Sequence, residues 1–114
     1  MLEQCYSNYT RNRNIKGSLM VAIVTKLKAK RGEEGKVEKA LRDVLPKVRA
    51  EEGTVVYSLH KKQDDPTTLM VFEKFKDMDA LLVHGTAPYV KDMLDTVTPL
   101  LDGDMSLEIY EEIA

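Results

Sequence analysis

Two side chains in this sequence combine proton-transfer chemistry with apolar neighbours. Glu73 alternates with Leu69, Val71 and Phe75, so on a strand its carboxylate would lie on an apolar face. A carboxylate in such a place should have either a raised pKa or a specific partner, and it could act as a base or as a substrate anchor. His84 lies on the flank of an apolar helical pattern, and imidazole exchanges protons near neutral pH. Either group could instead be structural, with Glu73 bonded to the backbone or to a lysine and His84 packed in the core.

Two tyrosines could contact a ligand beside these groups. Tyr57 shares a strand face with Val55 and Leu59. Tyr89 begins the last helical pattern, from which it could orient a phenolic ligand. A buried tyrosine commonly packs and makes one hydrogen bond, so core packing is the alternative for both.

Residues that would hold a metal or a nucleotide cofactor are scarce. The chain has one cysteine, Cys5, and two histidines, His60 and His84, which argues against a closed Cys/His zinc site. It also has no glycine-rich dinucleotide motif. We therefore expect neither a metal nor a cofactor.

Composition excludes several classes of partner. The 114 residues carry a formal charge of −2 and give a pI of about 5.7, so the basic footprint of a nucleic-acid-binding protein is missing. No apolar run approaches the roughly 18 residues of a membrane span, and the N-terminus lacks the apolar region of a secretory signal. With one cysteine and no internal disulfide, we expect a cytoplasmic protein without nucleic-acid or membrane partners.

The elements that must position these residues lie in one domain. Residues 1–18 are polar and without periodicity, and we interpret them as a disordered arm or a remnant of cloning. Residues 19–114 have the length and patterning of a single domain. Strand patterns cover residues 19–29, 54–62 and 68–76, and Met105, Leu107, Ile109 and Ile113 alternate in a last strand.

Helical patterns separate these strands. Val37 to Val48 recur at helical spacing around Pro46, where we expect a kink, and Gly53 is predicted to end this helix. After a turn over residues 63–67 and the third strand, Asp77 caps a short helix and Pro88 opens a further one. The apolar stripe of that last helix is predicted to extend to residue 101.

The order β-α-β-β-α-β is the ferredoxin-like arrangement of the α+β class. It predicts one four-stranded antiparallel sheet with helices on one face. Val56, Met70 and Phe72 are among the apolar residues expected on the other face, and a second subunit is expected to cover them.

One ordered set of short stretches runs through residues 19–114: Glu52-Gly53, Tyr57, Asp64-Asp65-Pro66-Thr67, Phe72-Glu73-Lys74-Phe75, Asp77 to Leu82, His84 and Pro88. This set resembles the antibiotic biosynthesis monooxygenase family, including its quinol monooxygenase members. The resemblance implies a dimeric α+β barrel, in which two ferredoxin-like units pack sheet to sheet, and hence a homodimer.

Two departures from the family pattern bear on activity. The family commonly has Glu-x-Trp on the third strand, where this chain has Glu73-Lys74-Phe75 and no tryptophan at all. Many members have a histidine after the proline that Pro88 matches, where this chain has Tyr89. Both departures argue against the haem degradation of some relatives.

The resemblance implies a cofactor-independent monooxygenase acting on a hydroquinone-like or polyphenolic small molecule. His84 or Glu73 would be the catalytic base, and Tyr57, Phe75 and Tyr89 would bind the aromatic substrate. Two alternatives remain open at this point: a non-catalytic small-ligand-binding protein of the same fold, and an isomerase acting on a small acid or lactone.

Overall fold

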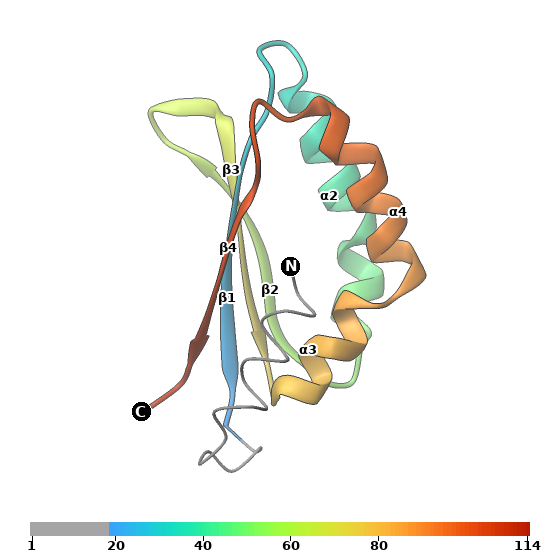
Figure 1. Cartoon of the computed structure of the whole chain (residues 1–114), viewed down its shortest axis with the longest axis vertical. Coiled ribbons are helices and arrows are strands. Elements are labelled where there is room, and N and C mark those ends of the chain that lie inside the picture. The colour runs from blue at the N-terminus through green and yellow to red at the C-terminus, as the bar shows by residue number, and fades with distance from the viewer. Residues whose placement is uncertain (1–18) are drawn as a thin grey trace.

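Four strands form a single antiparallel sheet in the computed structural model, which describes residues 19–114 (Figure 1). The strands are β1 (Val21–Lys28), β2 (Thr54–Lys62), β3 (Asp65–Phe75) and β4 (Ser106–Glu111). They lie in the order β2-β3-β1-β4, and each neighbouring pair is antiparallel. The predicted arm over residues 1–18 lies outside the described residues.

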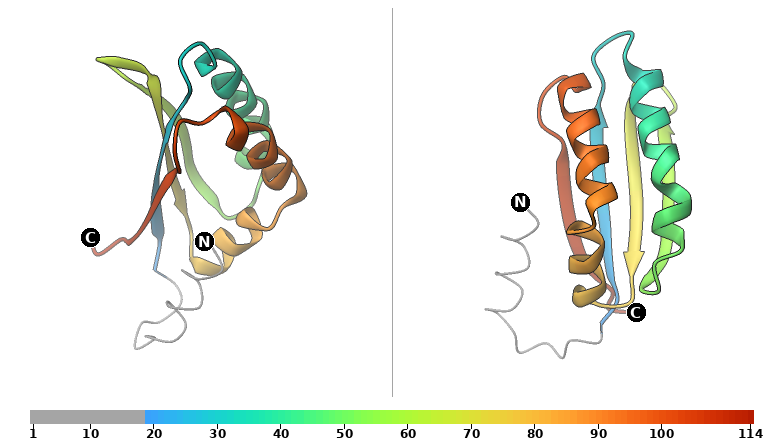
Figure 2. Two further views of the ribbon diagram at one scale, coloured as in Figure 1. Left: turned by 45° about the horizontal axis from the view of Figure 1, so that its top comes forward. Right: turned by 90° about the vertical axis from the view of Figure 1, so that its right-hand side faces the viewer.

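The helices cover one face of this sheet. They are α2 (Glu34–Arg49), α3 (Met78–Gly85) and α4 (Pro88–Val97), followed by the short 3-10 turn η1 (Thr98–Leu100). Figure 2 shows α2 and α4 side by side across the sheet, with α3 near one end of α4. The observed order confirms the predicted ferredoxin-like α+β fold, with its second helix divided in two.

Gly53 has a different role from the predicted one. Helix α2 continues through Pro46 to Arg49, with Ala50 as its C-terminal cap, so the prediction that Gly53 ends the helix is wrong. A Cβ atom at Gly53 would instead collide with the Cβ of Ala80. Gly53 therefore allows the start of β2 to lie close against α3.

The turn between β2 and β3 is shorter than predicted. β3 already begins at Asp65, so Gln63 and Asp64 alone connect the two strands. The Asp65 carboxylate accepts hydrogen bonds from the Thr67 amide at 3.1 Å and from the hydroxyls of Thr67 and Thr68 at 2.6 and 2.7 Å. These bonds lower the pKa of Asp65 to about 2. They also link the first residue of β3 to the third and fourth.

Three further predictions, one about a strand face and two about where an element ends, need correction. An irregularity between Thr54 and Val56 interrupts the alternation of β2, so Val55 is 48% exposed although Tyr57 is buried. Leu101 is not part of α4, which ends at Val97, but forms an isolated bridge with Ala29. Ile113 lies beyond β4 and is 95% exposed, so the predicted last strand is too long.

The core lies between the sheet and the helices. On β1 and β3, alternate residues point to this side and are buried, which places Glu73 within an otherwise largely apolar layer. By the same alternation, Val56, Met70 and Phe72 lie on the helix-free face, as predicted, and each is half-buried. The sheet therefore presents one face to the core and an open one with apolar side chains.

Candidate active site

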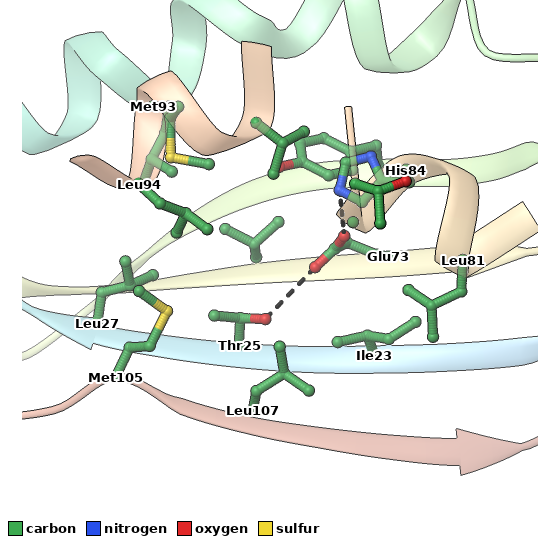
Figure 3. A pocket seen from close by; sticks show the side chains of 16 residues that line it. Ile23, Thr25, Leu27, Glu73, Leu81, His84, Met93, Leu94, Met105 and Leu107 are labelled. Atoms are coloured by element: carbon green, nitrogen blue, oxygen red, sulfur yellow. Dashed lines mark hydrogen bonds and ion pairs between the residues drawn. The ribbon is translucent and has the colours of Figure 1, made fainter. Parts of the chain in front are cut away.

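A cavity of about 310 Å³ lies between the sheet and the helices (Figure 3). Sixteen residues line it, most of them aliphatic residues or methionines. The polar side chains in its lining are those of Thr25, Tyr57, Glu73, His84 and Thr86. The cavity is thus an apolar chamber with a few polar groups, the usual composition of a small-molecule site.

Glu73 reaches this cavity because β3 alternates. The residue is 7% exposed, and it lies opposite Tyr57 on β2 and Ile23 on β1. Its Oε2 accepts a hydrogen bond from the Thr25 hydroxyl at 3.4 Å, and its Oε1 lies 3.3 Å from Nε2 of His84 (Figure 3). The carboxylate predicted on an apolar face therefore has specific partners.

Helix α3 brings His84 to the same wall. The Asp77 carboxylate caps the helix by accepting the amide of Ala80 at 2.8 Å, as predicted, and His84 lies one turn further on, in the last turn. The imidazole is 6% exposed, with the ring centroids of Phe75 at 5.0 Å and Tyr57 at 5.7 Å. Helix capping and ring packing together fix where the imidazole lies.

Glu51, in the segment between α2 and β2, contacts the other side of the imidazole. Both of its carboxylate oxygens lie 3.2 Å from Nδ1 of His84. The hydroxyl of Tyr89 donates a hydrogen bond to Oε2 of Glu51. Three side chains from different parts of the chain thus form one continuous arrangement, which we call the Glu51–His84–Glu73 triad.

The carboxylates of the triad affect the pKa values of His84 and of the neighbouring Tyr57. Burial alone would lower the pKa of His84, but the hydrogen bonds and charges of Glu73 and Glu51 outweigh it, and the pKa lies above its usual value. Burial, together with the charges of Glu73 and Glu51, raises the pKa of Tyr57 far above its usual value. The phenol of Tyr57 therefore stays protonated and can donate a hydrogen bond.

The structure brings three of the five predicted site residues into the cavity wall, namely Tyr57, Glu73 and His84. Phe75 and Tyr89 do not line the cavity. Phe75 packs against the imidazole, and Tyr89 directs its hydroxyl to Glu51.

Sequence reasoning missed two residues of this site. Thr25 could have been found, because it is a polar residue between Ile23 and Leu27 on the buried face of β1. Glu51 carried no such signal, since it stands next to Glu52 in a segment without periodicity.

Residues 19–114 contain no group of three or more His, Cys, Asp or Glu side chains arranged to hold a metal ion. In the triad the two carboxylates face opposite nitrogens of one ring, so they do not converge on a common point. Within the same residues, no helix has the length and apolar character needed to cross a membrane.

The chain belongs to the antibiotic biosynthesis monooxygenase family. The model of that family matches residues 20–96, which is more than half of the chain and includes every residue of the triad. No curated protein matches the sequence.

Solved structures from several organisms have the same fold. A Caulobacter crescentus protein, provisionally assigned as an antibiotic biosynthesis monooxygenase, is 27% identical with a TM-score of 0.83, and the match covers 91% of this chain and 99% of that one. A Shewanella oneidensis protein is 25% identical with a TM-score of 0.78, covering 83% and 92%. A Nitrosomonas europaea protein with the same provisional assignment is 19% identical with a TM-score of 0.80, covering 87% and 94%, and shares the fold.

Proposed function

We propose that the protein is a cofactor-independent monooxygenase that oxidises a small hydroquinone-like or polyphenolic molecule. The observation that carries this proposal is the buried Glu73–His84 pair in the wall of an otherwise apolar cavity. Membership of the antibiotic biosynthesis monooxygenase family supports it.

The chemistry uses the substrate as its own reductant. Removing a hydroxyl proton leaves an electron-rich phenolate, which passes one electron to O₂ before the two radicals join in a carbon–oxygen bond. Cleavage of the oxygen–oxygen bond then leaves one oxygen atom on the ring, and the other departs as water. For a hydroquinone the products are a hydroxyquinone and water, and the substrate supplies all four electrons that reduce O₂.

The side chains of the cavity suit this reaction. Glu73 and His84 provide a proton acceptor and a compensating charge beside the substrate hydroxyl, and Tyr57 can donate a hydrogen bond to an oxygen of the substrate. The apolar lining excludes water, which strengthens these electrostatic interactions.

Size and charge narrow the substrate class. A volume of about 310 Å³ is at the lower end of the range for ligand pockets, which favours a molecule of one or two rings. The nearby carboxylates of Glu51 and Glu73 disfavour a ligand that is itself a carboxylate. A neutral phenol therefore fits the cavity better than the small acid of the isomerase alternative.

We further propose that the protein acts as a homodimer in the cytoplasm. The helix-free face of the sheet carries Val56, Met70 and Phe72, and Val24 lies beside Phe72 on the same face. A second copy packed sheet to sheet would cover these residues. The single cysteine supports the cytoplasmic location.

Oxygen uptake tests the proposed activity. Protein treated with a chelator and free of flavin is mixed with a panel of reduced quinones and polyphenols, and uptake is compared with the autoxidation of each compound in buffer. We expect enzyme-dependent uptake of one O₂ per substrate. Rates equal to autoxidation across the panel would contradict the activity, and saturable binding without turnover would favour the ligand-binding alternative.

A further inference from the structure

Both ring nitrogens of His84 face carboxylates. Nδ1 lies 3.2 Å from each oxygen of Glu51, and Nε2 lies 3.3 Å from Oε1 of Glu73. The three residues come from the α2–β2 segment, from α3 and from β3, so the fold clamps the imidazole from two sides. Only the Glu73 side of this clamp opens on the cavity wall.

Glu51 is itself held in place by further partners. Its Oε2 accepts the hydrogen bond from the Tyr89 hydroxyl, and its Oε1 accepts one from the Thr54 hydroxyl at 3.3 Å. The Lys47 ammonium lies 5.7 Å from the centre of the Tyr89 ring, at the C-terminal turn of α2. The carboxylate of Glu51 is thus held by Thr54 and Tyr89, neither of which lines the cavity.

Two acceptors on opposite sides of an imidazole require two N–H groups. Neutral imidazole has only one, so its other nitrogen would point a lone pair at a carboxylate oxygen. The imidazolium donates to both carboxylates, and these charge-assisted bonds are the stronger kind. The geometry therefore selects the doubly protonated ring, which has no lone pair left to accept a substrate proton.

We propose that Glu51 is a positioning residue that keeps His84 an imidazolium, so that Glu73 and not His84 accepts the substrate proton. This inference rests on the proposed function and assigns roles within it. In the step, the O–H bond of the substrate breaks and an O–H bond forms on Glu73, while the electron pair stays on the substrate oxygen. The imidazolium then lies beside the new phenolate and stabilises its charge.

The other polar side chains around His84 add no charge that would change its protonation. From β2, Tyr57 stays a neutral phenol because its pKa is raised, and from α4, Tyr89 acts only through Glu51. From β1, Thr25 does not titrate. Among the described residues, the charges that face the imidazole are therefore those of Glu51 and Glu73, in agreement with the raised pKa of His84.

Nitrogen NMR of the histidine side chains tests the inference without any need for turnover. The ¹⁵N shifts of His84 separate the imidazolium from both neutral tautomers, and we follow them from about pH 5 to about pH 9 in the full chain. We expect both nitrogens of wild-type His84 to report an imidazolium at neutral pH. In Glu51→Gln the titration should move to lower pH, whereas Glu51→Asp, which keeps the charge, should retain most of the wild-type behaviour.

The control is Glu52→Gln, which removes the neighbouring exposed carboxylate and should leave the His84 signals unchanged. The only other histidine of the sequence, His60, lies on the exposed part of β2, and its signals are assigned separately with a His60→Gln spectrum. A folded Glu51→Gln protein whose His84 titrates as in the wild type would overturn the inference, and so would a neutral imidazole in the wild type. If Glu51→Gln fails to fold, the wild-type spectrum still shows whether His84 is an imidazolium at neutral pH. The Glu51→Asp spectrum then shows how far a displaced carboxylate changes that protonation.

These outcomes are separable from failure of the proposed activity. An imidazolium that depends on Glu51, in a protein that consumes no oxygen with any quinol, would support the positioning role and contradict the oxygenase. Where turnover is found, Glu51→Gln should change the pH profile of kcat and lower kcat more than it changes KM. An unchanged pH profile would count against the inference.

Discussion

Glu73 and His84 are both buried in the cavity wall, where each offsets part of the cost of burying the other. An isolated carboxylate or imidazolium there would face a desolvation penalty of several kcal/mol. Their attraction at 3.3 Å offsets part of this penalty, and Glu51 and Thr25 contact the other polar atoms of the pair. The proposed base and its imidazole partner thus lie together in a wall that is otherwise largely apolar.

Glu73→Gln removes the proposed base and preserves its shape. Glutamine can still contact Thr25 and His84, so we expect a folded protein whose turnover falls by about 10² to 10⁴, the usual contribution of a general base. Oxygen uptake at saturating quinol measures the loss, with Glu52→Gln as a control that retains full turnover. Full activity in folded Glu73→Gln would move the role of base away from Glu73.

His84 should make stability depend on pH. Its folded pKa is raised, so its stabilising contribution is complete below the unfolded pKa of about 6.5 and disappears as pH rises through the folded pKa. We expect the difference in free energy of unfolding between wild type and His84→Gln to shrink from acidic to alkaline pH. Urea unfolding at several pH values measures this difference. A difference that grows with pH would contradict the raised pKa.

At the scale of elements, the site depends on how closely α3 approaches the start of β2. Gly53 leaves no room for a Cβ beside Ala80, and the same helix carries His84. The hydrogen bond from the Lys76 amide to the Gly53 carbonyl, 2.9 Å long, joins the two regions as well. Small residues at this contact therefore set the position of the imidazole.

Gly53→Ala should displace α3. Overpacking of this kind costs about 1–3 kcal/mol, and the shift should also disturb the ¹⁵N signals of His84. The double variant Gly53→Ala with Ala80→Gly removes the colliding atom and should recover part of the stability. Gly35→Ala is the control, because no atom lies within 4 Å of its Cβ and alanine favours a helix. Equal stability of Gly53→Ala and Gly35→Ala would contradict the close contact.

Local patterns predicted the elements better than the contacts between them. Alternation around Glu73, the cap at Asp77 and the proline at 88 depend on near neighbours in sequence, and these predictions hold in the structure. The pairing of Glu51 with His84 spans 33 residues, and neither periodicity nor capping distinguishes Glu51 from Glu52. Such a contact depends on how α3 packs against the α2–β2 segment, which local patterns do not encode.

At the scale of the whole molecule, the helices cover only one of the two sheet faces (Figure 1). The open face combines the half-buried apolar residues Val24, Met70 and Phe72 with charged residues such as Lys26 and Glu108. A partner of the same sequence would bury these apolar side chains in both subunits at once.

Light scattering should give about twice the 12.9 kDa mass of the chain at micromolar concentration. Phe72→Glu puts a charge on the helix-free face, beside Val24, and should shift the mass toward that of the monomer. Val83→Glu changes an exposed apolar residue on α3 and should leave the mass unchanged. A wild-type monomer at this concentration would contradict the dimer.

The most direct test of the proposed oxygenation is the mass of the product formed under ¹⁸O₂ by chelator-treated, flavin-free protein. The reaction proposed for Glu73 and His84 places one atom of O₂ on the ring and releases the other as water. We therefore predict a hydroxyquinone that carries one ¹⁸O atom with the wild type and little product with Glu73→Gln. A product without ¹⁸O, or labelled product formed as fast by Glu73→Gln as by the wild type, would contradict the account.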